Sequence, residues 1–112
     1  MSTDFNIISE THNEILVLKT VGYINNTAGE RIVEEFSKNY GGAMKKVVMD
    51  LEESKVVNSI GISYLIDIIE KLNQTGGKLV FTNLDPTIEK TFNIMGIFQF
   101  AEKADSVDSA LK

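Results

Sequence analysis

The sequence is first informative for the residue types that it lacks. It contains no cysteine, which excludes disulfides and thiolate metal sites. Its single histidine, His12, cannot form a multi-histidine metal site. Proline occurs only once, and no apolar run approaches the roughly 18 residues of a membrane span. Any specific chemistry must therefore come from carboxylate, hydroxyl and amide side chains.

The charge balance narrows the classes of partner. The chain has 16 acidic and 11 basic residues, a net charge of -5, which argues against nucleic acid and anionic membrane as partners. Hydrophobic residues make up 43% of its 112 residues, as in ordinary globular proteins. We therefore expect one domain over residues 1–112 with a single core. No signal peptide is visible, so we expect a cytoplasmic location.

Apolar runs and helical spacing alternate along the chain. Strands are expected at residues 5–9, 15–21, 46–51 and 78–82, with a short edge strand at 97–100. Helices are expected at residues 27–40, 59–73, 86–95 and 105–111. Strands that alternate with helices predict parallel crossovers and helices on the sheet faces. The predicted class is α/β, with a mixed, mostly parallel sheet of four to five strands and about four helices.

Polar residues and glycines indicate where these helices begin and end. A capping box starts at Thr27, and Asp85 before a proline is a predicted N-cap. The glycine pairs 41–42 and 76–77 are expected to end the first and second helices. Met95 is expected on the core face of the third helix.

The most chemically specific feature is Ser59, which stands where a buried strand is followed by a long helix. The free backbone N–H groups and positive dipole at a helix start favour a phosphate group. One interpretation is therefore a phosphoacceptor serine. The other is a residue of the helix start, whose hydroxyl caps the helix or, if Asn58 is the cap, points outward.

Other candidate chemistry is sparse. Asp50, Glu52 and Glu53 follow a strand, where a carboxylate or magnesium site is conceivable, but we favour a solvated loop. His12 lies in a predicted exposed turn without an orienting partner, which indicates a surface residue. We therefore expect no catalytic residues, no metal, no cofactor and no enzymatic activity.

The element order and the residues around Ser59 resemble the STAS domain of bacterial anti-sigma factor antagonists. That family has a hydrophobic strand ending in Asp, then the motif Asp-Ser-(Ser/Thr/Ala)-Gly-Leu-Gly and an apolar helix. Here the strand reaches Asp50, and the motif reads Asn58-Ser59-Ile60-Gly61-Ile62-Ser63. Residues 22–25, Gly-Tyr-Ile-Asn, resemble the family's Gly-x-Leu-Asp. The resemblance covers nearly the whole chain and implies a STAS fold.

In that family the serine is phosphorylated by a partner that is both an anti-sigma factor and a Ser/Thr kinase. The unmodified protein binds this partner and frees the sigma factor, and phosphorylation blocks the binding. The resemblance implies that Ser59 is the phosphorylation site and that a PP2C-type phosphatase is a further partner. It also implies the partner-binding residues Asn25, Asn58, Ser59, Ile60, Gly61 and Ser63. We expect a monomer or weak dimer.

The motif departs from the family at several positions. Asn58 and Asn25 replace two Asp residues, and each keeps a hydrogen-bonding shape without the charge. Ser63 replaces a glycine and is a second, poorer candidate for modification. Ile60 replaces a small residue and is equally expected outside or in the core. The missing acids favour an alternative, a non-phosphorylated scaffold subunit of a transporter or signalling assembly, and a small enzyme is a third possibility.

Overall fold

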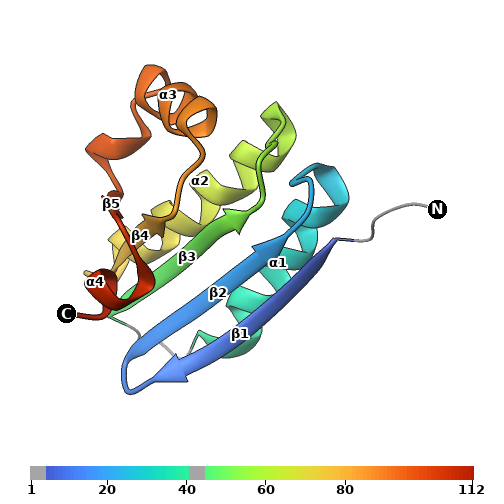
Figure 1. The fold of residues 1–112 in the computed structure, drawn as a ribbon. Helices are drawn as coiled ribbons and strands as arrows, with labels where there is room; N and C mark the ends of the chain where they lie inside the picture. Colours follow the sequence, from blue (N-terminus) through green and yellow to red (C-terminus); the bar gives the residue numbers. More distant parts are fainter. Residues whose placement is uncertain (1–4, 41–44) are drawn as a thin grey trace.

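A five-stranded sheet with the order β1-β2-β3-β4-β5 organises the protein (Figure 1). The structure is a computed structural model that describes residues 5–40 and 45–112. β1 (Asn6–His12) pairs with β2 (Ile15–Val21) in an antiparallel hairpin. β3 (Lys46–Glu53), β4 (Lys78–Thr82) and β5 (Glu102–Ala104) continue the sheet with parallel pairings. The predicted α/β class and the mixed, mostly parallel sheet are confirmed.

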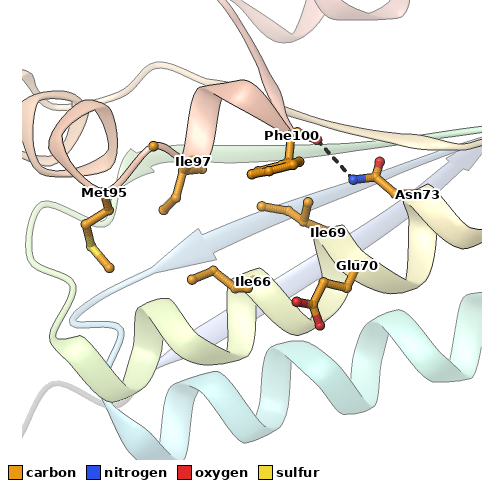
Figure 2. A pocket seen from close by; sticks show the side chains of 8 residues that line it. Ile66, Ile69, Glu70, Asn73, Met95, Ile97 and Phe100 are labelled. Atoms are coloured by element: carbon orange, nitrogen blue, oxygen red, sulfur yellow. Dashed lines mark hydrogen bonds between the residues drawn. The ribbon is translucent and has the colours of Figure 1, made fainter.

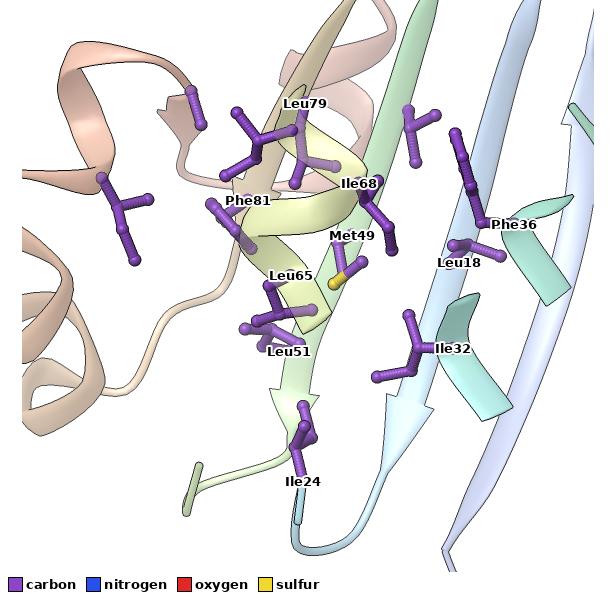
Figure 3. Close-up of a cluster of buried hydrophobic side chains, with 14 of the residues drawn as sticks. Leu18, Ile24, Ile32, Phe36, Met49, Leu51, Leu65, Ile68, Leu79 and Phe81 are labelled. Atoms are coloured by element: carbon purple, nitrogen blue, oxygen red, sulfur yellow. The ribbon is translucent and has the colours of Figure 1, made fainter. Parts of the chain in front are cut away.

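Helices cover both faces of this sheet. α1 (Asn26–Asn39) and α2 (Ser59–Gln74) lie on one face, where the main core includes Leu18, Met49 and Leu65 (Figure 3). α4 (Val107–Leu111) packs against β3, β4 and β5, and a smaller core cluster joins it to β2, β3 and β4. α3 (Pro86–Ile94) and the 3-10 helix η1 (Ile97–Gln99) connect β4 to β5. None of the helices in the described ranges has the length and apolarity needed to cross a membrane.

Polar side chains cap the starts of α1, α2 and α3. Asn58 caps α2, its Oδ1 accepting the Gly61 amide at 2.7 Å, and the predicted Asp85 cap of α3 is confirmed. The capping box predicted at Thr27 is wrong, because the residue that caps α1 is Asn25, two residues earlier. The chain just before Asn25 is already fixed by pairing with the segment after β3, and that pairing sets the helix start.

The glycines predicted to end α2 do so. Gly76 adopts a left-handed φ of 80° after α2, and the next amide bonds to the carbonyl of Leu72 at 2.9 Å. The stop predicted for the first helix, at residues 41–42, lies outside the described residues.

The segment after α3 differs from the prediction. Residues 97–100 were expected as a strand, but they contain η1, and the edge strand is Glu102–Ala104. Gly96, with φ 75°, turns the chain, and the amides of Gln99 and Phe100 bond back to Gly96 and Ile97. These local bonds replace strand pairing. The prediction that Met95 faces the core is also wrong: α3 ends at Ile94, and Met95 is 49% exposed.

The segments that follow β2 and β3 stay paired beyond the ends of the strands. The amide of Ile24 bonds to the carbonyl of Val56 at 2.9 Å, and the carbonyl of Ile24 accepts the amide of Asn58 at 3.1 Å. A Cβ placed on Gly61 would lie only 2.4 Å from that same carbonyl oxygen. The first turn of α2 therefore lies directly against the segment that leads into α1, and this contact requires a glycine.

We expect Gly61→Ala to destabilise the protein by about 1–3 kcal/mol, because the added methyl group forces the backbone at Ile24 to move. Urea unfolding measures the change. Ser63→Ala is the control, an exposed position on the same helix where the expected change is within about 0.5 kcal/mol. Equal stability of Gly61→Ala and the unmodified protein would contradict this close contact.

Candidate functional site

Ser59 is the first residue of α2 and is exposed. Asn58 provides the cap, so the interpretation of Ser59 itself as the capping residue is contradicted. Within residues 5–40 and 45–112, the Ser59 hydroxyl has no hydrogen-bond partner. The remaining interpretation, with Asn58 as the cap and the serine hydroxyl outward, describes a group that an enzyme can reach.

The backbone around Ser59 is electropositive. Asn58 satisfies the Gly61 amide through its side chain and the Ile62 amide through its carbonyl, at 2.7 and 2.9 Å. The amides of Ser59 and Ile60 have no partner among the residues that the structure describes. Neither α1 nor α2 carries an acidic residue in its first turn. The positive ends of both helices are therefore uncompensated, which favours an anion at this edge of the sheet.

Asn25 and Asn58 have equivalent structural roles. Asn25 Oδ1 accepts the Ala28 amide at 3.0 Å, just as Asn58 Oδ1 accepts the Gly61 amide. A cap of this kind needs only an acceptor oxygen, which Asn and Asp both supply. The two asparagines therefore preserve the cap geometry while leaving the site without two carboxylate charges.

Apolar side chains surround the Ser59 end of the molecule. Ile60 is 51% exposed, so it points outward and is not part of the core. Tyr23 and Val56, on the two paired segments, are also about half exposed. Both residues lie in segments, residues 22–27 and 52–59, that the sequence predicts as docking segments, and the fold leaves their side chains uncovered. Together with Ile60 they form a surface suited to a protein partner.

The Tyr64 side chain of α2 packs against the beginning of α1. A Cβ on Gly29 of α1 would lie 2.4 Å from the Tyr64 ring, so the ring packs directly on that glycine. The Tyr64 hydroxyl lies 3.4 Å from Asn26 Oδ1 and from Glu30 Oε2. Partial burial, together with the nearby Glu30 carboxylate, raises the pKa of Tyr64.

The other partner-binding residues predicted from the sequence have different positions. Ser63 is exposed one turn beyond Ser59, but its hydroxyl donates to the Ile60 carbonyl at 2.6 Å. Gly61 is buried against Ile24, so its role here is to position the helix. The exposed members of the predicted set are therefore Ser59, Ile60 and Ser63.

The acidic residues after the third predicted strand do not form a solvated loop. They lie within β3, and Asp50 is only 6% exposed, accepting bonds from the Glu52 amide and the Asn83 side chain. Glu53 pairs with Lys19 at 3.3 Å, and this hydrogen bond raises the pKa of Lys19. Over the part of the chain that the structure describes, no three His, Asp or Glu side chains are grouped to hold a metal.

His12 lies far from this site. It is the last residue of β1, at the hairpin turn, whereas Ser59 lies at the opposite, carboxyl end of β2 and β3 (Figure 1). Its exposed ring contacts Glu10 at 3.1 Å. The expectation that His12 is a surface residue is confirmed, but His12 ends β1 and does not lie in the turn itself, and Glu10 is a partner that the sequence did not indicate.

Comparisons with known proteins agree with this architecture. BtrV of Bordetella bronchiseptica, a candidate anti-sigma factor antagonist, is 25% identical over 96 residues, 86% of this chain and 83% of BtrV. The Bacillus cell fate determinant SpoIIAA in its phosphorylated form has a TM-score of 0.76 at 21% identity, covering 95% and 96% of the two chains. A candidate anti-sigma factor antagonist from Thermotoga maritima has a TM-score of 0.85 at 10% identity, covering 94% and 91%.

A family model described as the STAS domain matches residues 6–110, nearly the whole chain. The fold agrees with this match. The chain therefore belongs to the STAS domain family.

Proposed function

We propose that this protein is an anti-sigma factor antagonist whose binding to its partner is switched by phosphorylation of Ser59. The unmodified protein binds an anti-sigma factor that is also a Ser/Thr kinase, and a sigma factor is released. The observation that carries this proposal is the exposed, unbonded hydroxyl of Ser59 at an uncompensated helix start. A PP2C-type phosphatase restores the unmodified form. The protein acts as a cytoplasmic interaction module without catalysis of its own.

The proposed docking surface consists of the exposed residues around Ser59. It comprises residues 22–27, residues 52–59 and the first turns of α2, with Ile60, Tyr23 and Val56 as apolar contacts. In the phosphorylation step, Ser59 Oγ attacks the γ-phosphorus of ATP held by the partner. The bond from that phosphorus to ADP breaks, and the hydroxyl proton passes to a base of the kinase. Asn25, Asn58 and Gly61 hold the surface in place.

The fold tolerates the phosphate that this step adds. A dianion at a helix start is favourable by roughly 0.3–2 kcal/mol, so phosphorylation leaves the domain folded. Phosphorylation instead weakens binding of the partner, because a bulky charged group occupies the centre of an apolar contact surface. The switch therefore acts at the interface and not through unfolding.

The lost acids support a second candidate, a scaffold subunit of a transporter or signalling assembly that is not phosphorylated. With Asn25 and Asn58 as neutral caps, a kinase that recognises carboxylates beside the serine has no such groups to bind. Stable incorporation into such an assembly, with no phosphate on Ser59 in cells, distinguishes the scaffold from the switch.

Phosphosite mapping after incubation with the purified cognate kinase and ATP tests the site. We expect one phosphate on Ser59, none on Ser59→Ala, and normal incorporation into Ser63→Ala, because the Ser63 hydroxyl is bonded to its own helix. Incorporation at another residue, or none in the unmodified protein, would refute the proposed site.

Ser59→Glu tests whether the effect is confined to the interface. We expect its affinity for the partner to fall at least about tenfold, or 1.4 kcal/mol. Its melting temperature should stay within about 4 °C of the unmodified protein or rise, because the new charge faces a positive helix end. Ser37→Glu, an equal charge change at an exposed position of α1, is the control and should retain affinity. Strong destabilisation of Ser59→Glu would contradict a switch limited to the interface.

A further inference from the structure

An apolar groove of about 210 Å³ lies between α2 and the segment formed by the end of α3 and η1. Ile66 and Ile69 form its α2 wall, and Met95, Ile97 and Phe100 form the opposite wall (Figure 2). The rim is unusually apolar for a free surface. Phe100 is 62% exposed, Met95 49% and the adjacent Ile94 77%. Three large apolar side chains so close to one groove indicate a surface that another molecule covers.

The groove also carries one charge. Glu70 is the only ionisable residue that lines it, and it has no ion pair within residues 5–40 and 45–112. Asn73 also lines the groove, and its side-chain amide already donates a hydrogen bond to the Phe100 carbonyl at 3.5 Å. The complementary ligand therefore has an apolar side chain for the groove and a cation beside it for Glu70.

The groove lies on the same face of α2 as Ser59. Positions 59, 63, 66, 70 and 73 recur at spacings of three and four residues, so they share this face. At 1.5 Å per residue, Ile66 lies roughly 10 Å and Glu70 roughly 16 Å along the axis from Ser59. A partner that covers Ser59 and extends by two or three helical turns along α2 reaches the groove.

We propose that the groove is a second docking point for the same anti-sigma partner, which inserts an apolar side chain and pairs a Lys or Arg with Glu70. This inference rests on the proposed function and adds where and how the partner is held. A second copy of this chain fits the groove less well. Two-fold pairing through the groove brings two Glu70 carboxylates together, and none of the lining residues is a cation.

The separation of the two docking points has a consequence for the switch. Groove contacts lie about two to three helical turns from the Ser59 phosphate, so phosphorylation weakens one point and leaves the other intact. Substitutions in the groove and at Ser59 then act independently, and their effects on the binding free energy add. The phosphorylated protein keeps a residual affinity that depends on the groove.

Calorimetry measures the affinity of the purified cognate anti-sigma kinase for this protein and its variants. We expect Met95→Ser and Phe100→Ser each to weaken binding by about fivefold to tenfold, and by the same factor in a Ser59→Glu background. Ile8→Ser is the matched control, because Ile8 is also 49% exposed but lies on β1. Circular dichroism confirms that each variant is folded.

A charge reversal tests the cation. Glu70→Lys should weaken binding more at 50 mM than at 500 mM salt, since the loss is electrostatic. Glu34→Lys, an equal reversal at an exposed position of α1, should have little effect.

The outcomes separate this inference from the proposed function. If the unmodified protein does not bind the kinase, both fail. A different outcome is that the unmodified protein binds the kinase and Ser59→Glu weakens this binding. If Met95→Ser and Phe100→Ser then bind within about twofold of the unmodified protein, only the groove assignment fails. Sedimentation that shows a dimer of the unmodified protein, lost in Met95→Ser, assigns the groove to a second copy and also overturns the inference.

Discussion

The backbone of Ile24 is the contact on which the arrangement of the site depends. Its amide and its carbonyl both bond to the segment after β3, and the Ile24 side chain is fully buried. Gly61 lies so close to the same carbonyl that any larger residue would displace it. Because these contacts extend the β2–β3 pairing past the strand ends, α1 and α2 begin side by side. The two helix ends, the two asparagine caps and Ser59 are positioned together as a result.

The electrostatic character of the site follows from this alignment. Two positive helix ends face one edge of the sheet, and both are capped by neutral side chains. Asp residues at the same positions would partly compensate those dipoles in advance. Here the two caps supply no negative charge, and a phosphate on Ser59 would supply it. The same neutrality leaves no carboxylate at the two cap positions, Asn25 and Asn58.

Much of the framework could be predicted because local signals agree with the fold. The strands at residues 15–21 and 78–82 match because their apolar runs are covered on both faces. The α2 start and the Asp85 cap match because each depends on the chain immediately around it. One error occurs where a distant contact competes with local preference, and another where a local turn replaces strand pairing. Pairing of Ile24 with Val57 moves the cap of α1 from Thr27 to Asn25, and a left-handed Gly96 turns residues 97–99 into a 3-10 helix.

The sequence by itself determined the α/β class, the order of elements and the prominence of Ser59, because periodicity and helix-start chemistry are local properties. Tertiary structure decided which side chains are free. In the folded chain Asp50 is buried and accepts hydrogen bonds, and Ile60 is exposed. Met95 and Phe100 lie beside an uncovered groove. Exposure depends on what packs over a residue from elsewhere in the chain. The serine could therefore be identified from its neighbours in sequence, whereas the surface around it required the folded molecule.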